Sequence, residues 1–274
     1  MVNAFELKRE LEARGFKAKI SVVEKNGVMK TGISILSDNI ITPVFYINDC
    51  IGSPADVAKS IINVYFDYKE DCNGYVETVK NLTWDKAKDN IYICVQPFVN
   101  EANYITKGYL DLQMYVRLYL DHNTSVKVDE DIVNMFNISE LQLWERAREN
   151  TEKILVAEGS GAILQVFDDN YDESDMDKLM YPLVLSTKTR MYGASWICFK
   201  DKLDKFVDLI GEDFYIIPSS IHEILLVPCS YIENPIEMKR IILEVNDAVV
   251  DPTEILSYNV YKYYRAIKDV ILVI

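Results

Sequence analysis

One short segment of the sequence gathers side chains that could do chemistry together. The run PSSIHE at 218–223 places two hydroxyls, an imidazole and a carboxylate between two apolar stretches, FYII and EILLV. Connections held between rigid strands are common positions for functional residues. In an extended chain, Ser220 and His222 lie on the same side with their Cα atoms ~6.6 Å apart. His222 with Glu223 or Ser220 is therefore the candidate catalytic set of a hydrolase or transferase.

The same residues also fit a structural role. A catalytic nucleophile and its base usually come from different segments, with a third residue orienting the base. Serines beside a turn commonly satisfy backbone groups, and the His222 imidazole could bond a carbonyl or Glu223. Cys229 offers no Cys–His pair, because a straight strand over 223–228 would place it ~20 Å from His222. We predict that His222 is mainly structural and orients the turn.

Motifs for cofactors and metals are missing from the sequence. There is no G-x-G-x-x-G and no G-x-x-x-x-G-K-[ST], so neither phosphate cradle is present. The two histidines are His122 and His222, and Leu226 stands where H-E-x-x-H needs its second histidine. The acidic run 168–177 begins like a calcium loop, but the turning glycine and the final acid are absent. We predict no cofactor, no metal site and a solvated loop at 168–177.

Charge narrows the classes of partner. The chain has 29 Lys and Arg against 43 Asp and Glu, with a formal net charge of −14. Direct binding to nucleic acid or to an anionic membrane needs clustered basic residues, so neither is expected. The acidity either serves solubility, or attracts a basic partner or imitates nucleic acid. A protein or a small molecule remains the expected partner, and the oligomeric state stays open.

Cysteine usage and the N-terminal segment indicate the compartment. The five cysteines are odd in number and show no C-x-x-C spacing, which favours reduced thiols over a disulfide framework. The first residues, MVNAFELKRELEARG, lack an apolar signal region, and no stretch approaches 18 uninterrupted apolar residues. These features predict a cytoplasmic protein.

Periodicity predicts the elements that hold these residues. It indicates a helix over 5–14, a hairpin across Asn26-Gly27 and a helix that starts at Ser53. Alternation over 109–120 predicts one long strand with leucine, methionine and valine on the core face. Its other face carries Tyr109, Asp111, Gln113, Tyr115, Arg117 and Tyr119. We interpret that tyrosine-rich face as packing, with recognition of a partner as the alternative.

Strands in the second half occur in PLVLST, FYII and EILLV, and the apolar end 269–274 is expected to be ordered. Adjacent strands outnumber strict β-α-β alternation, which predicts an α+β fold with mixed, mainly antiparallel sheets packed by helices. The glycine-containing and acidic stretch over 159–177 is the best hinge candidate. It suggests N-terminal and C-terminal α+β lobes at 1–150 and 151–274, or one continuous domain.

Three segments carry a resemblance to a known family: LSTKTRMYGAS at 185–195, DFYIIPSSIHEILLVP at 213–228 and EVNDAVVDPTEILSYNVYKY at 244–263. With TGISI and PVFYIN near the start, they make the chain resemble a domain-of-unknown-function family abundant in gut Clostridia, the Lachnospiraceae and relatives. The likeness covers nearly the whole chain. It implies a bacterial cytosolic protein of about this size and transfers no functional residue.

Three hypotheses about function follow. The leading one is a non-catalytic cytosolic binding or regulatory protein of a gut Firmicute or its mobile element, because catalytic motifs are missing and strand faces are rich in tyrosine. The second is a hydrolase or transferase that uses His222 with Glu223 or Ser220. The third is an acidic inhibitor that mimics nucleic acid. A closed pocket around His222 with a third polar residue would favour the enzyme.

Overall fold

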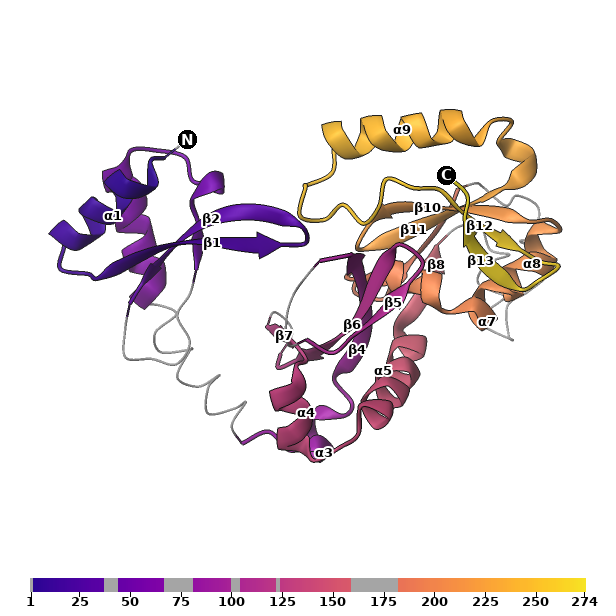
Figure 1. Ribbon diagram of the computed structural model, residues 1–274, viewed down its shortest axis with the longest axis horizontal. Coiled ribbons are helices and arrows are strands. Elements are labelled where there is room, and N and C mark those ends of the chain that lie inside the picture. The colour runs from indigo at the N-terminus through magenta and orange to yellow at the C-terminus, as the bar shows by residue number, and fades with distance from the viewer. Residues whose placement is uncertain (1, 37–43, 67–80, 100–103, 122–123, 159–181) are drawn as a thin grey trace. The chain divides into compact units, whose positions relative to one another are not determined.

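A computed structural model describes residues 2–36, 44–66, 81–99, 104–121, 124–158 and 182–274. Helices and antiparallel sheets make the chain an α+β protein, which confirms the predicted class (Figure 1). Contacts divide it into two compact units, Met1–Thr83 and Trp84–Ile274. Residue 150, the predicted lobe boundary, lies in a helix of the second unit. The predicted hinge at 159–177 and the acidic run within it lie outside the described residues.

The first unit begins with helix α1 (Ala4–Ala13). The Asn3 side chain accepts hydrogen bonds from the backbone N–H groups of Phe5 and Glu6, which caps the helix start. The chain leaves the helix through Gly15 at φ +87°, a left-handed conformation that glycine adopts without a steric penalty. The helix predicted over 5–14 is therefore confirmed to within one residue.

The predicted hairpin follows α1. Strands β1 (Ala18–Lys25) and β2 (Val28–Ile35) pair in antiparallel register. The turn residues Asn26 and Gly27 have φ values of +51° and +78°, so both adopt the left-handed conformation that a type I′ turn requires. The short strand β3 (Phe45–Tyr46) pairs with β2 and continues into the 3₁₀ turn η1 (Ile47–Asp49).

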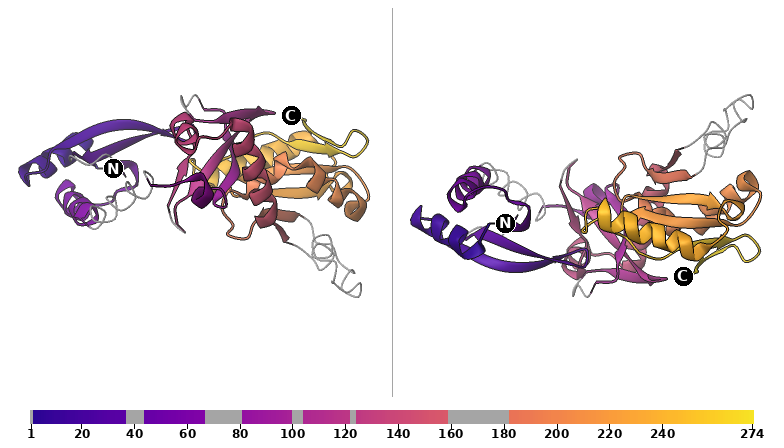
Figure 2. Two further views of the ribbon diagram at one scale, coloured as in Figure 1. Left: turned by 90° about the horizontal axis from the view of Figure 1, so that it is seen from below. Right: turned by 90° about the horizontal axis from the view of Figure 1, so that it is seen from above.

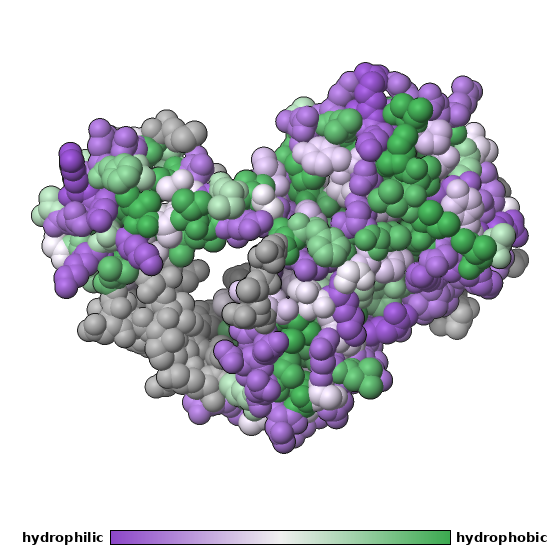
Figure 3. Space-filling view, viewed as in Figure 1, coloured by the Kyte–Doolittle hydropathy of each residue, from purple (hydrophilic) through white to green (hydrophobic). Residues whose placement is uncertain are grey.

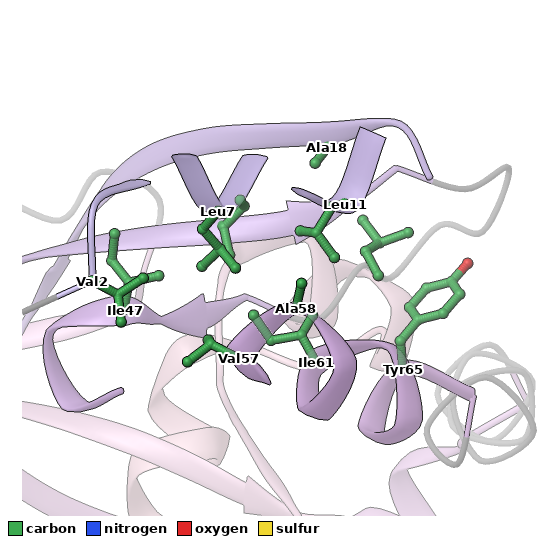
Figure 4. Close-up of a cluster of buried hydrophobic side chains, with 11 residues drawn as sticks. Val2, Leu7, Leu11, Ala18, Ile47, Val57, Ala58, Ile61 and Tyr65 are labelled. Carbon is green, nitrogen blue, oxygen red and sulfur yellow. The ribbon is translucent and has the colours of Figure 1, made fainter. Parts of the chain in front are cut away.

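Helical residues 54–66 complete the core of the first unit. The Ser53 hydroxyl accepts from the Asp56 backbone N–H at 3.2 Å, as the sequence predicts for this helix start. Leu7 and Leu11 of α1 point toward the side chains of this second helix (Figure 4). The buried side chains drawn and labelled there are Val2, Leu7, Leu11, Ala18, Ile47, Val57, Ala58, Ile61 and Tyr65.

The second unit begins with α3 (Trp84–Ala87) and a four-stranded antiparallel sheet. Strand β6 (Leu112–Tyr119) pairs along its length with β4 (Ile91–Pro97). On its other side, β6 pairs first with β5 (Thr106–Tyr109) and then with β7 (Ser125–Lys127). Helices α4 (Glu130–Phe136) and α5 (Glu140–Ile154) follow. The α5 start is a capping box, in which Ser139 and Gln142 exchange hydrogen bonds between side chain and backbone.

The single strand predicted over 109–120 is wrong at its start. Leu110, with φ +55°, and Asp111 form the turn between β5 and β6, so the Leu110 side chain is exposed. From Leu112 onward the alternation holds. The apolar face of the sheet is buried, as are the α5 side chains nearest to β4: Ile91, Ile93, Val95, Leu112, Val116, Leu118, Leu143 and Ala147. The opposite face is called the polar face below and carries Tyr92, Cys94, Gln96, Thr106, Gln113, Tyr115, Arg117, Tyr119, Ser125 and Lys127.

A six-stranded antiparallel sheet with the order β13-β12-β10-β11-β9-β8 forms the rest of the second unit. Its strands are β8 (Leu155–Glu158), β9 (Leu183–Thr187), β10 (Phe214–Ser220), β11 (Glu223–Pro228), β12 (Tyr261–Tyr264) and β13 (Asp269–Leu272). Because β8 continues directly from α5 and pairs with β9, the two sheets belong to one compact unit. The division by contacts therefore falls after Thr83 and keeps α5 and β8 in the same unit.

Buried aromatic side chains tie the six-stranded sheet to its helices. The helical segments after β9 are η3 (Gly193–Cys198), α7 (Lys200–Leu203) and α8 (Lys205–Ile210). Trp196 is fully buried, and its Nε1–H group donates to the carbonyls of Val156 at 3.2 Å and Ser186 at 2.8 Å. This side chain therefore joins η3 to β8 and β9 and satisfies its own polar atom.

Helix α9 (Pro235–Ala248) follows η4 (Cys229–Tyr231) and lies along one face of the six-stranded sheet (Figures 1 and 2). Ile242 packs there with Tyr215 and Val260. On its outer side, α9 shows apolar side chains among hydrophilic ones (Figure 3). The chain end is ordered, as predicted: β13 pairs with β12, and Val270 is buried.

Asp111 links the two sheets of the second unit. Its carboxylate accepts hydrogen bonds from Ser257 Oγ at 3.1 Å, Asn259 Nδ2 at 2.8 Å and the Tyr261 hydroxyl at 2.7 Å. Three neutral donors thus hold one anion, so the relative placement of the sheets is fixed by directional contacts as well as by packing. Among the described residues, no helix is long and apolar enough to cross a membrane.

Candidate functional site

The candidate residues His222, Glu223 and Ser220 lie at the hairpin between β10 and β11. Ser220 pairs with Glu223, so Ile221 and His222 form a two-residue turn, and Ser219 is the extra residue of a β-bulge. The Ser220 hydroxyl accepts a hydrogen bond from the His222 backbone N–H at 3.0 Å. It therefore caps the turn, and the structure gives it no hydrogen bond to the imidazole.

Glu223 is also engaged within the hairpin. The bulge aims the Ser219 hydroxyl at Glu223, and Ser219 Oγ donates to Glu223 Oε1 at 3.0 Å. The sequence suggested Glu223 as a nearby acceptor for His222, but the acidic side chain beside the imidazole is Glu254. The three candidates are neighbours in space, yet their hydrogen bonds do not connect nucleophile, base and acid.

Both nitrogen atoms of the His222 ring have a partner. Nδ1 accepts a hydrogen bond from the Tyr192 backbone N–H at 3.0 Å, so in the neutral imidazole the proton resides on Nε2. Nε2 lies 3.5 Å from Glu254 Oε1. A general base needs a lone pair that faces the substrate. Here the one lone pair of the neutral ring points at a backbone amide.

The turn itself is fixed to β9 and η3. The His222 carbonyl accepts from the Gly193 backbone N–H at 2.9 Å and from Ser186 Oγ at 2.8 Å. A Cβ atom on Gly193 would lie 2.4 Å from Ser186 Cα and 2.5 Å from the His222 carbonyl oxygen. Only glycine allows this approach. The Ile221 N–H donates to the Glu254 carbonyl at 2.8 Å, which completes the backbone hydrogen bonding of the turn.

Tyr192 connects the hairpin with the four-stranded sheet. Its backbone adopts the left-handed conformation at φ +57°, which places its N–H against His222. The Tyr192 ring packs 5.3 Å from the His222 ring, measured between centroids. The guanidinium carbon of Arg117 lies 4.7 Å from the centroid of the same tyrosine ring. The Arg117 guanidinium, the Tyr192 ring, the His222 imidazole and the Glu254 carboxylate therefore lie next to one another in space, in that order.

Arg117 belongs to the polar face, where hydrogen bonds run from strand to strand. Lys127 Nζ donates to Gln96 Oε1 at 2.9 Å, and Gln96 Nε2 donates to Gln113 Oε1 at 3.0 Å. Gln113 in turn donates to Thr106 Oγ1 at 3.3 Å. Gln96 and Gln113 are buried, so these contacts satisfy polar groups that have lost water.

The Arg117 guanidinium is largely shielded from solvent. Its Nε–H donates to Ser125 Oγ at 3.0 Å, and the Tyr115 hydroxyl also interacts with it. Within the described part of the chain, no carboxylate lies at ion-pair distance from Arg117. In register, Arg117 pairs directly with Lys127, so two cationic residues face one another across β6 and β7.

Burial keeps the other polar groups of this face protonated. It raises the pKa of the Tyr115 hydroxyl well above its ordinary value, and it also raises the pKa values of Tyr119 and Tyr192. The pKa of the Cys94 thiol rises to about 12, mainly through burial. At neutral pH these hydroxyls are therefore hydrogen-bond donors, and among the described residues the Arg117 guanidinium has no ion pair.

Sequence reasoning missed most of this arrangement. Arg117 was placed on a tyrosine-rich strand face, but Tyr192, Glu254, Ser125 and Lys127 were not singled out. They come from β7, from the turn before η3 and from the segment before β12. The one available signal was Arg117 and Lys127 on consecutive strands of a hairpin, and it appears only once the β6–β7 register is known.

Only part of the residues behind the metal and thiol predictions lies within the described chain. Among the described residues, no group of three or more His, Cys, Asp and Glu side chains is placed to hold a metal ion, and the calcium-like run 168–177 lies outside them. Cys50, Cys94, Cys198 and Cys229 form no disulfide. Cys72 and His122 also lie outside the described residues.

Comparison with known proteins bears on the family alone. No curated protein matches the chain, and neither does any solved structure. A family model does match, over residues 4–265, and its description is "Family of unknown function (DUF5688)". The match spans both compact units and includes the hairpin, Tyr192, Glu254 and the polar face. The chain therefore belongs to the family of unknown function DUF5688.

Proposed function

We propose that the protein is a non-catalytic binding or regulatory protein whose ligand contacts the polar face around Arg117. The observation that carries the proposal is a difference in how polar groups are used. Both ring nitrogens of His222 are engaged within the chain, whereas the Arg117 guanidinium has no carboxylate partner among the described residues. A largely shielded charge without a counter-ion costs free energy that a bound anion recovers.

The hydrolase or transferase alternative has less support. It needs a hydroxyl that gives its proton to a lone pair on His222. Ser220 Oγ instead accepts from the His222 backbone, and the Nδ1 lone pair accepts from Tyr192. Using His222 as a base would require breaking a hydrogen bond that fixes the turn. The proposed setting is the cytoplasm of a gut Firmicute, which follows from the resemblance and from the thiols.

A panel of small ligands tests the proposal. Thermal unfolding should be followed with anionic, neutral and cationic compounds for the wild type, Ser220→Ala and Arg117→Met. Anionic compounds should stabilise the wild type and Ser220→Ala, by about 2.7 kcal/mol at a ligand concentration of 100 Kd. Arg117→Met should lose this stabilisation. Ser220→Ala is the matched control, because it removes the candidate nucleophile and leaves the polar face intact.

Turnover assays test the alternative on the same variants. Hydrolysis of p-nitrophenyl acetate and p-nitrophenyl phosphate should not exceed the buffer rate for any of them. Enzymatic hydrolysis that Ser220→Ala and His222→Ala both abolish, while the fold is retained, would replace the binding proposal with a hydrolase. Stabilisation by anions that persists in Arg117→Met would place the ligand elsewhere.

A further inference from the structure

Helix α9 buries much less of its apolar surface than α5, the other long helix of the second unit. The fully buried side chains of the 15-residue α5 are Leu143, Trp144, Ala147, Asn150 and Thr151. The 14-residue α9 buries only Ile242 and Asn246, although it contains more isoleucine, leucine and valine than α5. Helices in proteins are stabilised mainly by packing of their apolar face. α9 therefore carries apolar side chains that its contact with the six-stranded sheet does not use.

Three of these side chains form a stripe along one side of α9. Ile241, Val245 and Val249 follow one another at intervals of four residues, with Val249 as the C-cap, and they are 49%, 46% and 78% exposed. Residues four apart lie on the same side of a helix, ~6 Å further along its axis. Seen from above, α9 lies in front of the six-stranded sheet (Figure 2). Contiguous exposed apolar side chains with polar residues around them are typical of an interaction site.

Acidic side chains border the stripe. Glu237 lies four residues before Ile241 and Glu244 lies three residues after it, so both carboxylates belong to the same side of the helix. Arg240 pairs with both, at 2.5 Å from Glu237 and 2.6 Å from Glu244. One cation thus serves two exposed carboxylates. The exposed acidic residues on α9 and in its flanking segments are Glu233, Glu237, Glu244, Asp247 and Asp251.

This combination of charge and shape selects one kind of partner. A second copy would bring two acidic helices together, and an anionic membrane or a nucleic acid would also be repelled by a chain of net charge −14. A basic partner is attracted to the same surface, and complementary charge speeds its encounter. An apolar stripe with a spacing of four residues is the ridge that packs against the side chains of another helix.

We propose that Ile241, Val245 and Val249, with Glu237 and Glu244, form a docking surface for a basic amphipathic helix of another protein. The apolar side of that helix covers the stripe, and its lysine or arginine side chains pair with the two glutamates. The surface belongs to the six-stranded sheet and its helix, whereas the polar face belongs to the four-stranded sheet. Its role therefore does not depend on anion binding at Arg117.

Synthetic peptides added to the full chain test the surface. The probe is a peptide of about 18 residues, or about five helical turns, with leucine on one side and lysine on the other. One comparison peptide has glutamate in place of lysine, and a second has the leucine and lysine residues in scrambled order. Fluorescence anisotropy should give the lowest Kd for the patterned basic peptide, with both comparison peptides weaker by about 10-fold or more.

Substitutions on α9 locate the binding. Ile241→Ser should raise the Kd of the basic peptide about 10-fold, because it removes most of one buried apolar side chain from the interface. Glu237→Gln combined with Glu244→Gln should raise it about 3- to 10-fold and weaken its dependence on salt. Leu141→Ser is the matched control, because Leu141 is 63% exposed but lies on α5. Leu141→Ser and Arg117→Met should both bind the peptide as the wild type does.

Other outcomes would overturn the proposal. Equal affinity for the patterned and scrambled basic peptides would mean that net charge alone attracts them, and no binding of the basic peptide at millimolar concentration would refute the surface. An equal loss in Leu141→Ser and Ile241→Ser would place the binding elsewhere. Dimerisation in sedimentation experiments that Ile241→Ser abolishes would assign the stripe to a second copy. Binding to phosphatidylcholine vesicles that Ile241→Ser abolishes would assign it to a lipid surface. Far-UV circular dichroism of every variant establishes that the fold is retained.

Discussion

The β10–β11 hairpin and the polar face of β6 both present polar side chains within the second unit, but they use them in opposite ways. In the hairpin, Ser220, His222 and Glu223 each have a partner from the turn or its immediate neighbours. On the polar face, one series of hydrogen bonds runs from Lys127 through Gln96 and Gln113 to Thr106. Arg117 donates to Ser125, and its charge has no described counter-ion. The polar side chains of the hairpin therefore satisfy one another and their turn, whereas Arg117 on the polar face has no described ion pair.

This difference shows why residues that are adjacent in sequence are a weak guide to a site. Polar residues that interrupt two apolar strands must satisfy the backbone of the turn they form. Their clustering is then a consequence of the turn. Two cationic residues in directly opposed positions on paired strands, as Arg117 and Lys127 are, become neighbours only through the register. The predictions below test that distinction.

The largest expected effect concerns Cys94, a buried residue of the polar face. Its thiol is buried, and its pKa of about 12 leaves far less thiolate at pH 8 than an exposed thiol of pKa about 8.5 has. Since thiolate is the reactive form, alkylation by iodoacetamide should be slower in the native protein than in urea by on the order of 10³-fold. Peptide-resolved mass spectrometry measures both rates.

Cys50 is the control for this measurement, because it is partly exposed and should react much closer to its rate in urea. Rapid native alkylation of Cys94 at the rate of Cys50 would mean that the polar face opens to solvent. The polar face would then not hold Cys94 in a buried position in solution.

The next effect is on the hairpin. Gly193→Ala should lower the free energy of unfolding by about 3 kcal/mol or more, because its Cβ would meet backbone atoms of Ser186 and His222 that cannot move aside. Gly108→Ala on β5 is the matched control. Its Cβ would lie 3.4 Å from the Phe98 ring, an ordinary contact. Urea denaturation compares the two, and equal stability would show that η3 does not hold the turn.

A smaller effect compares a substitution in the hairpin with a substitution on the polar face. His222→Ala should cost about 1–2 kcal/mol, since it removes the acceptor of the Tyr192 N–H. Arg117→Met should leave stability unchanged or raise it, because it removes a shielded charge that lacks an ion pair within the described residues. Thermal unfolding in one buffer measures both. A greater loss in Arg117→Met than in His222→Ala would make Arg117 the structural residue of the two.

Much of the fold could be predicted because its signals are local. The Asn26-Gly27 turn and the Ser53 helix start follow from single residues and their spacing. The β5–β6 turn could not be predicted in this way. It uses Leu110 in a left-handed conformation, without glycine or proline, and the apolar alternation runs straight through it. Nothing in the local pattern distinguishes such a turn from a continuous strand.

The site was less predictable because local sequence patterns carry no information about contacts between distant segments. Its residues are joined by contacts between distant segments: Tyr192 with His222, and Arg117 with Tyr192. Glu254 reaches His222 because the backbone of Ile221 bonds to the Glu254 carbonyl. The Arg117–Tyr192 contact depends on the packing of the two sheets, and the other two contacts depend on how the segments around the six-stranded sheet meet. The sequence places Glu223 beside His222 and so favours the wrong acid.

The smallest expected effect identifies that acid. In a double-mutant cycle, His222→Ala and Glu254→Gln should couple by about 0.2–1 kcal/mol, the range for a pair with one largely exposed partner. The Glu254 side chain is 47% exposed, and its Oε1 lies 3.5 Å from Nε2, so a larger value is not expected. Glu254→Gln keeps the backbone carbonyl that holds Ile221. The parallel cycle with Glu223→Gln should show no coupling, because Glu223 bonds Ser219.

Salt at 1 M should reduce the Glu254 coupling, since screening at that concentration acts within about 3 Å. Coupling to Glu223 that exceeds coupling to Glu254 would restore the acid that the sequence favours and reopen the hairpin as a catalytic candidate.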